Sequence, residues 1–261
     1  MLKRRLIPKL QLGLRRSFRG AQPVLVVTRQ FGGRRAIGDP LSQAKIYEAQ
    51  LADELILVDL ERTEESWAVL LSMVKALSEA LATPLAVGGG VQSLDQVQSL
   101  LDRGADKVVL NTAALREPDL IDRVANAYGA QCVVLSMDVR PQSEGGWRVW
   151  SEGGKLDEGR EALPWGREAV DRGAGEVMVT SIERDGTGEG LDLALTTTLA
   201  KELPVPIIAS GGCGLAQHFV EGYQAGASAV AAGTFFCQRD QSPMQCRSHI
   251  SNAGVPIRIE I

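Results

Sequence analysis

The stretch Ala52–Arg62, ADELILVDLER, recurs in altered form at Ala174–Arg184, AGEVMVTSIER. The same offset lays Pro84 over Pro206 and Thr112 over Thr234. Each half alternates short apolar runs with helical patterns, and this repeat predicts an α/β fold, a (β/α)8 TIM barrel of two duplicated half-barrels. We expect one domain over residues 1–261, with half-barrels at about 1–128 and 129–261.

The eight strands expected of this barrel are nearly continuous apolar runs, typical of parallel strands that are buried on both faces. They are residues 5–11, 54–60, 84–88, 107–111, 132–138, 176–182, 206–210 and 228–233. Two long loops, Leu12–Asp39 and Arg140–Leu163, follow the first and fifth strands. Both should overhang the C-terminal face, where barrel enzymes hold their active sites. The second loop contains two Gly-Gly pairs, which indicate a hairpin.

Composition excludes several classes of protein. The net charge of −4 gives no reason to expect nucleic-acid binding, and no apolar run reaches the roughly 20 residues of a membrane span. With only two histidines and no metal-ligand spacing among the cysteines, we expect no metal site, no cofactor, reduced thiols and a cytoplasmic protein. The cysteines are Cys132, Cys213, Cys237 and Cys246.

A cluster of basic residues near the N-terminus has two interpretations. One is a targeting segment, and the other is the first barrel strand, which the apolar run Leu6-Ile7-Pro8 favours. The cluster comprises Lys3, Arg4, Arg5, Lys9, Arg15, Arg16 and Arg19.

Glycine-rich turns follow strands in both halves and predict two phosphate sites on opposite sides of the barrel. Glycine lets backbone N–H groups approach an anion closely, and a following helix N-terminus adds a positive dipole end. Two such sites fit a ligand with a phosphate at each end, whereas the alternative is that the glycines only permit tight turns. The candidate residues are Gly90, Asn111 and Thr112 in the first half, and Asp185, Gly186, Gly212, Gly233 and Thr234 in the second.

Six motifs together resemble the cyclase subunit of imidazole glycerol phosphate synthase, over essentially the whole chain. They are Val87–Val91, Arg103–Val108, Leu110–Ala114, Gly173–Glu176, Arg184–Thr187 and Ile207–Gly212. The resemblance implies a duplicated half-barrel that binds a bisphosphate ligand. It also implies that ammonia from a partner glutaminase passes through the barrel and is used to close an imidazole ring.

The resemblance implies two catalytic aspartates, at the ends of the first and fifth strands. The second matches Asp138, but the first falls on Gln11. A carboxamide has no proton to exchange near neutral pH, so it cannot replace a carboxylate in acid–base catalysis. The family's loop lysine falls on Val27, and an alternative is that Lys9 or Arg29 substitutes for it.

Four charged residues at the starts of strands match the ring that gates ammonia entry in the family. They are Arg5, Glu54, Lys107 and Glu176. The resemblance implies that a glutaminase docks over this N-terminal mouth. The alternative is a polar plug that only stabilises the barrel, since charges on this face usually serve stability.

An intact ring without the first acid resembles a paralogous branch of the family that accompanies surface-polysaccharide proteins and a glutaminase. Val108–Asn111 and Ala229–Phe236 support this resemblance. It implies that the chain passes ammonia to an ATP-dependent amidotransferase acting on an acetamido sugar. Two alternatives stay open: an active or weakly active cyclase subunit of histidine biosynthesis, and a phosphate-binding scaffold without ammonia traffic.

Overall fold

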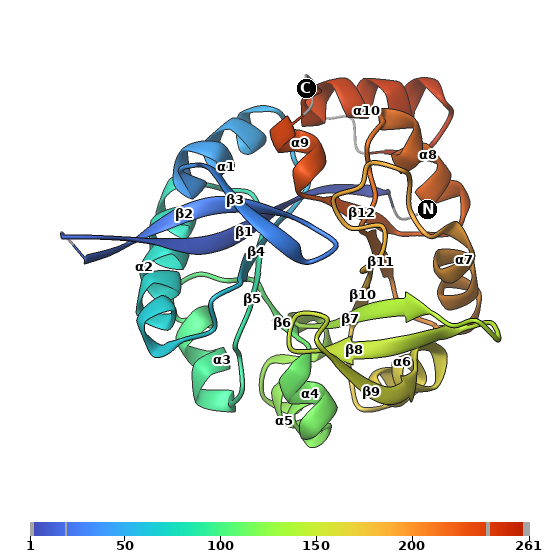
Figure 1. Ribbon diagram of the computed structural model, residues 1–261, viewed down its shortest axis with the longest axis horizontal. Coiled ribbons are helices and arrows are strands. Elements are labelled where there is room, and N and C mark those ends of the chain that lie inside the picture. The colour runs from blue at the N-terminus through green and yellow to red at the C-terminus, as the bar shows by residue number, and fades with distance from the viewer. Residues whose placement is uncertain (1–2, 19, 239–240, 258–261) are drawn as a thin grey trace.

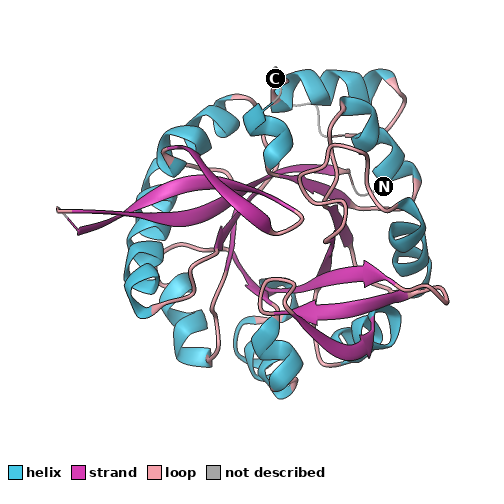
Figure 2. Cartoon of the chain, in the orientation of Figure 1, coloured by secondary structure: helices cyan, strands magenta, loops and turns pink. Residues whose placement is uncertain are grey.

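The computed structural model describes residues 3–18, 20–238 and 241–257, which form a closed barrel with helices around it (Figures 1 and 2). Neighbouring barrel strands pair in parallel, and the pairing of β7 with β10 closes the cylinder. The barrel strands are β1 (Arg5–Ser17), β4 (Leu55–Asp59), β5 (Leu85–Gly88), β6 (Lys107–Leu110), β7 (Val133–Pro141), β10 (Glu176–Ser181), β11 (Ile207–Ser210) and β12 (Ala229–Ala232). The predicted (β/α)8 fold and its strands are confirmed, while the division into halves near residue 128 stays a prediction.

Helices connect the strands on the outside of the barrel. A capping box begins α2, in which the Thr63 side chain accepts from the Ser66 backbone and the Ser66 side chain accepts from the Thr63 backbone. None of the helices within the described ranges is long and apolar enough to cross a membrane. The helices are α1 (Pro40–Ala49), α2 (Glu64–Ala80), α3 (Leu94–Leu101), α4 (Thr112–Arg116), α5 (Asp119–Tyr128), η1 (Ala130–Cys132), α6 (Ala162–Asp171), α7 (Leu193–Glu202), α8 (Ala216–Gln224), α9 (Thr234–Gln238) and α10 (Pro243–Asn252).

The residues after the first strand correct the sequence prediction. Instead of a loop, β1 continues to Ser17 and returns as β2 (Gly20–Arg29), which pairs with β3 (Gly32–Gly38). The basic N-terminal cluster therefore lies in or beside β1, apart from Arg19, which lies outside the described residues. This antiparallel extension lies over the barrel mouth in Figure 1.

The predicted hairpin after the fifth strand is confirmed. The chain returns from β7 as β8 (Trp147–Ser151) and β9 (Leu156–Glu161), both antiparallel to their neighbours. Gly145 and Gly146 make the first turn with φ of 94° and 83°, a region that L side chains rarely adopt. Both extensions therefore overhang the same face of the barrel (Figure 2).

Strand alternation divides the buried residues into two clusters. On β1, Leu6 and Leu10 belong to the large outer cluster beneath the helices, whereas Ile7 belongs to an inner cluster inside the barrel. Because side chains alternate along a strand, Lys9 and Gln11 follow Ile7 on the inward face. The inner cluster comprises Ile7, Ile56, Ala86, Val109, Val134, Met178, Ile208, Ala229 and Ala231. An apolar layer thus lies below a polar one.

Candidate functional site at the C-terminal mouth

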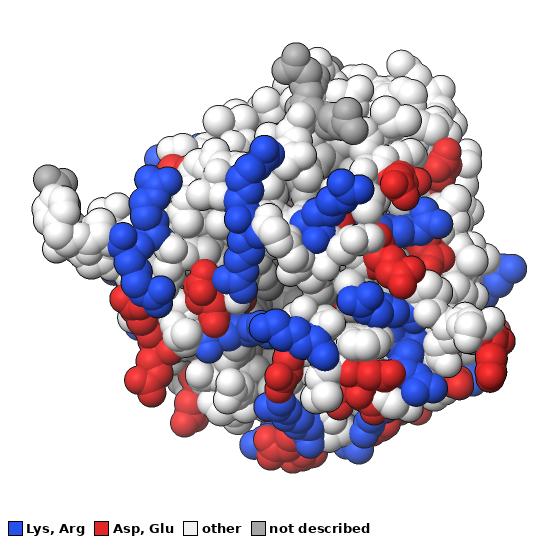
Figure 3. Space-filling view, viewed as in Figure 1, with Lys and Arg blue, Asp and Glu red and all other residues white. Residues whose placement is uncertain are grey.

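A cavity of about 540 Å³ opens at the C-terminal ends of the strands, a volume typical of small-molecule sites. Its lining includes the predicted site residues Gln11, Gly90, Asn111, Thr112 and Asp138. Inward-facing Ser136 and Thr180 lie beside them and are buried. Figure 3 views this face and shows Lys and Arg side chains on several sides of its centre.

The second-half candidates line a smaller neighbouring pocket. Its lining includes Asp185, Gly186, Gly212, Gly233 and Thr234. Lys9 lines both this pocket and the large cavity, so it lies where the two predicted phosphate sites meet. The candidates of each half therefore lie together, in two adjoining pockets of which the second holds only about 10 Å³, and phosphate binding itself stays a prediction.

Close packing alone explains why two of these positions are glycines, with no need for a ligand. A Cβ on Gly186 would lie 2.1 Å from the Thr28 carbonyl oxygen, and one on Gly212 would lie 2.0 Å from the Gly190 carbonyl oxygen. Gly90 differs, because a Cβ there would meet nothing closer than Arg62 at 3.4 Å, although its φ of 77° also favours glycine. Close packing at tight turns therefore explains why Gly186 and Gly212 are glycines. The turn at Gly90 is more open to an approaching anion.

Asp138 faces the cavity from the inward side of β7. Burial raises the pKa of Asp138 to about 6, although Lys9, the hydrogen bond from Asn111 and Arg62 oppose the rise, and Asp185 adds to it. Asn111 Nδ2 donates to Asp138 Oδ2 over 2.8 Å. A carboxyl group that titrates near neutral pH is suited to exchanging protons with a ligand.

Gln11 lies at the matching position on β1 and is 7% exposed. Its Nε2 donates a long, 3.4 Å hydrogen bond to Thr28 Oγ1, whose own hydroxyl donates to Asp185 Oδ2 at 3.0 Å. Val27 is buried and does not line the cavity, whereas the next residue, Thr28, does. Of the two suggested substitutes for the loop lysine, Arg29 is exposed and outside the cavity lining, and Lys9 is part of it.

The four charged residues at the N-terminal mouth form a closed ring of alternating sign. Arg5 Nη1 lies 2.5 Å from Glu54 Oε2 and 3.1 Å from Glu176 Oε1. Lys107 Nζ lies 3.0 Å from Glu54 and 3.1 Å from Glu176. Burial lowers the pKa of Arg5, but the two carboxylates outweigh it and hold this pKa above its ordinary value. The ring is therefore one electrostatic unit across the barrel mouth.

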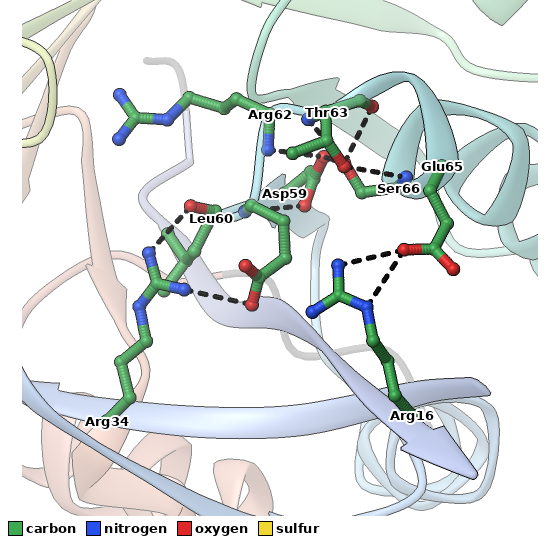
Figure 4. Close-up of polar contacts among 9 residues, drawn as sticks. Arg16, Arg34, Asp59, Leu60, Arg62, Thr63, Glu65 and Ser66 are labelled. Carbon is green, nitrogen blue, oxygen red and sulfur yellow. Dashed lines mark hydrogen bonds and ion pairs between the residues drawn. The ribbon is translucent and has the colours of Figure 1, made fainter. Parts of the chain in front are cut away.

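The sequence did not predict four cationic side chains that line the cavity. They are Arg34, Arg62, Arg116 and Lys155. Arg34 binds Glu61 at 2.9 Å and the Leu60 carbonyl at 2.7 Å, and Arg116 pairs with Glu152. Within the described part of the chain, the guanidinium of Arg62 has no ion-pair partner, and Figure 4 shows it pointing away from the contacts around Asp59. The internal repeat could have pointed to Arg62 as a site residue, because it aligns Arg62 with Arg184.

Asp59 fixes the turn that carries Arg62. Its Oδ1 accepts from the Glu61 backbone at 2.9 Å, and its Oδ2 accepts from the Arg62 backbone at 3.1 Å and from Ser66 Oγ at 2.6 Å. A separate ion pair ties the extension to the start of α2, since Arg16 binds Glu65 at 2.8 Å (Figure 4). Several hydrogen bonds therefore hold the turn that carries Arg62 in place.

Metal binding finds no support in the described ranges, which contain no group of three or more His, Cys, Asp or Glu residues arranged to hold an ion. No disulfide joins the four cysteines, all of which lie within the described ranges. Three of them, Cys132, Cys213 and Cys246, are buried.

Known proteins resemble this chain along its whole length. The sequence pattern of a family described as histidine biosynthesis protein matches residues 15–242. A protein of Prochlorococcus marinus strain MIT 9313, which carries the provisional name imidazole glycerol phosphate synthase subunit hisF2, is 63% identical, and the match covers 100% of both chains. The protein named imidazole glycerol phosphate synthase subunit HisF of Gluconacetobacter diazotrophicus is 41% identical over 99% of this chain and 97% of its own. The protein of that name from Anoxybacillus flavithermus is 39% identical over 99% of this chain and 100% of its own.

Proposed function

Because the chain belongs to the histidine biosynthesis protein family, among the HisF subunits of imidazole glycerol phosphate synthase, we propose that it is the barrel subunit of a glutamine-dependent amidotransferase. In this proposal ammonia enters at the N-terminal mouth, passes along the barrel axis, and reaches a phosphate-bearing ligand at the C-terminal mouth. A glutaminase subunit that docks over the N-terminal mouth supplies the ammonia.

The charged ring is the observation that carries this proposal. Its two cations and two carboxylates alternate, and each cation pairs with both carboxylates, so a cation can release one carboxylate while it keeps the other as the ring opens. Directly above the ring lies the apolar inner cluster. Neutral ammonia crosses such a layer at little cost, whereas an ammonium ion loses its hydration there. The ring and the layer together favour passage of the uncharged molecule.

The C-terminal mouth favours ammonia delivery over efficient ring closure. Asp138 remains as one proton-exchanging group, but its partner position holds Gln11, which accepts and donates hydrogen bonds without changing protonation state. Losing one of a pair of acid–base groups lowers the rate by about 10²–10⁴-fold. We therefore propose that the final acceptor is handled by a second enzyme, an ATP-dependent amidotransferase acting on an acetamido sugar of a surface polysaccharide.

A second candidate function is ring closure itself, as the cyclase subunit of histidine biosynthesis. The names of all three relatives, at 63%, 41% and 39% identity, favour it. Asp138 favours it as well, because it provides one acid–base group at the large cavity. A phosphate-binding scaffold without ammonia traffic is the third candidate, and it leaves the charged ring without a role other than stability.

Co-purification with the native glutaminase separates these candidates. We expect a stable complex whose glutaminase activity rises when the barrel subunit and its acceptor system are added. Product should form from glutamine, while ring closure with ammonium and the bisphosphate substrate stays nearly absent. Ring closure at the rate of a histidine-pathway enzyme establishes the second candidate, and a chain that binds no glutaminase supports the scaffold.

Ligand binding at the cavity is tested without a partner. A ligand that binds only the folded chain raises its melting temperature, so inorganic phosphate should stabilise the protein. Arg62→Met should reduce this shift, because Arg62 is a cavity-lining cation beside Gly90. Arg123→Met removes an exposed cation from α5 and is the matched control. No shift at millimolar phosphate, in a chain that melts normally, contradicts phosphate binding.

A further inference from the structure

Asp53 and Arg247 form a buried ion pair next to the charged ring, and the proposed function gives neither residue a role. Asp53 immediately precedes Glu54 of the ring, and its side chain is 5% exposed. Arg247 lies on α10, near the other end of the chain, and its Nη2 lies 2.9 Å from Asp53 Oδ1. The same nitrogen donates to the Leu51 carbonyl oxygen. Arg247 therefore joins α10 to the segment that leads into β4.

The other oxygen of the Asp53 carboxylate reaches the strand that carries Arg5. Asp53 Oδ2 accepts from the Leu6 backbone N–H at 2.8 Å, and the Asp53 backbone N–H donates to the Leu6 carbonyl oxygen at 3.2 Å. Leu6 immediately follows Arg5 on β1. One residue therefore fixes the main chain beside two members of the ring, Arg5 and Glu54.

Two further contacts join the C-terminal part of the chain to the same strand. Tyr223 on α8 is 3% exposed, and its hydroxyl donates to the Arg5 carbonyl oxygen at 2.9 Å. Beyond α10, the Pro256 carbonyl oxygen accepts from the Arg4 backbone N–H at 3.0 Å. Helices α8 and α10 lie next to each other on the outside of the barrel (Figure 1). Together they hold the main chain on both sides of the Arg5 side chain.

The second half of the barrel fills the position of Asp53 differently. The internal repeat lays Asp53 over Gly175, which precedes Glu176 of the ring and has no side chain to form such a bond. A Cβ on Gly175 would lie 2.2 Å from the Ala130 carbonyl oxygen, so main chain occupies the place of the carboxylate. The barrel thus closes at Glu176 without a carboxylate before it, and closure alone does not account for Asp53.

We propose that Asp53 and Arg247 are positioning residues that hold Arg5 and Glu54 within the charged ring, so that the position of α10 sets the geometry of the ring. The segment after α10 bonds to β1 at the N-terminal mouth, and Pro256 in it is exposed. A partner that docks over this mouth therefore meets the segment that leads to α10. The inference rests on the proposed function for the role of the ring as an ammonia entrance.

Hydrogen exchange at the Arg5 guanidinium tests this hold on the full chain, without a partner. Nitrogen NMR follows the exchange, which reports how often the ion pairs of Arg5 open. Arg247→Met should speed exchange at Arg5 several-fold, because the segment before β4 loses its bond to α10. Exchange of the Val134 backbone amide on β7, across the barrel from β1, should stay unchanged. Equal acceleration at Arg5 and Val134 means a general loss of stability and overturns the proposal.

Further variants separate position from charge and folding. Removal of Arg247 alone leaves Asp53 buried without this cation, which by itself destabilises a folded chain. The double variant Asp53→Asn, Arg247→Met removes both charges, so it should fold, and its exchange at Arg5 should still be fast. Arg247→Lys keeps a cation beside Asp53 and should largely restore slow exchange. Slow exchange in the double variant contradicts the proposal.

Arg172→Met is the matched control for Arg247→Met. It removes an ion pair of similar length, in which Arg172 Nη1 on the C-terminal side of α6 lies 2.8 Å from Asp122 Oδ2 on α5. This pair has no bond to the main chain beside Arg5, so exchange at Arg5 should match that of the wild-type chain. Fast exchange at Arg5 in Arg172→Met contradicts a specific role for α10.

The assembled system tests the consequence for ammonia. In Arg247→Met, product formation from glutamine should fall several-fold more than product formation from ammonium, and Arg247→Lys should recover much of the ratio. Faster exchange at Arg5 with a wild-type ratio supports the hold on the ring and contradicts the ammonia entrance of the proposed function. Wild-type exchange at Arg5 in Arg247→Met overturns the positioning role, whatever the ratio.

Discussion

Asn111 Nδ2 donates to Asp138 Oδ2 over 2.8 Å, and the other end of the same amide, Asn111 Oδ1, is buried without a hydrogen-bond partner in the described part of the chain. A buried polar atom without a partner is rare in folded proteins. Since Asn111 lines the cavity, this oxygen is placed to accept an N–H from ammonia or from a ligand. Asn111 thus links the Asp138 carboxyl to a buried acceptor oxygen in the same cavity lining.

Asn111→Ala should raise the pKa of Asp138 above its value of about 6. The hydrogen bond from Asn111 stabilises the ionised carboxylate, so its loss favours the protonated form. Carbon NMR titration of the Asp138 carboxyl group measures the change. Thr112→Ala is the control, because Thr112 lines the same cavity but bonds the Glu152 backbone. A lower or unchanged pKa in Asn111→Ala contradicts the assignment.

Asp138→Asn should stabilise the protein at pH 8. The pKa of Asp138 is raised from 3.8 to about 6 on folding, so its contribution to stability is full below 3.8 and is lost as the pH rises through about 6. Asparagine removes the buried charge, and we expect the free energy of unfolding to rise by about 1–3 kcal/mol at pH 8.

Calorimetry of Asp138→Asn at pH 4 and pH 8 checks both the direction and the pH range. The gain should nearly vanish at pH 4, where the folded chain carries Asp138 protonated. Asp171→Asn, at the exposed end of α6, should change stability little at either pH. A loss of stability at pH 8 for Asp138→Asn means that the ionised carboxylate is well solvated in the cavity.

The barrel strands could be predicted from the sequence, but the antiparallel strands β2 and β3 that follow Ser17 could not. Buried parallel strands such as Val133–Pro141 leave apolar runs, which the sequence shows directly. In contrast, β3 is almost entirely exposed, and its pairing with β2 depends on main-chain hydrogen bonds that any residue can make. Arg15 and Arg16 on the outer part of β1 further hide the strand pattern.

The candidate site was predictable where it lies at strand ends and less so where it depends on distant packing. Asp138 and Asn111 follow apolar runs, so their place at the mouth is a direct consequence of the fold. The surroundings of Lys9 include Ser210 of β11 and residues of β12, near the other end of the chain. Only the closed barrel brings these residues together, so the sequence could not place Lys9 beside Ser210.

Gln11→Asp should raise ring closure with ammonium and the bisphosphate substrate above the level of the wild-type chain. It restores a proton-exchanging group on the inward face of β1, where Thr28 and Asp185 already form a polar chain. The gain should be modest, because Val27 leaves the loop-lysine position apolar. Gln11→Asn keeps a carboxamide and is the matched control. Equal turnover of Gln11→Asp and Gln11→Asn contradicts a missing acid at this position.

Lys107→Ala should reduce product formation from glutamine several-fold more than product formation from ammonium. It leaves Glu54 and Glu176 sharing Arg5 alone, which disturbs both the ring and the surface proposed for glutaminase docking. Ammonium in solution reaches the C-terminal mouth without crossing the ring, so the second activity should be largely kept. Parallel assays of the assembled system with each nitrogen source measure the ratio.

Lys75→Ala is the control for Lys107→Ala, since Lys75 pairs with Glu79 on the exposed surface of α2. A polar plug makes a different prediction for Lys107→Ala. Glu54 is only 3% exposed, so removal of a cation beside it destabilises the folded chain. Both activities would then fall together with the melting temperature. A constant ratio of the two activities at a lowered melting temperature therefore identifies a plug, and a changed ratio at similar stability identifies an entrance.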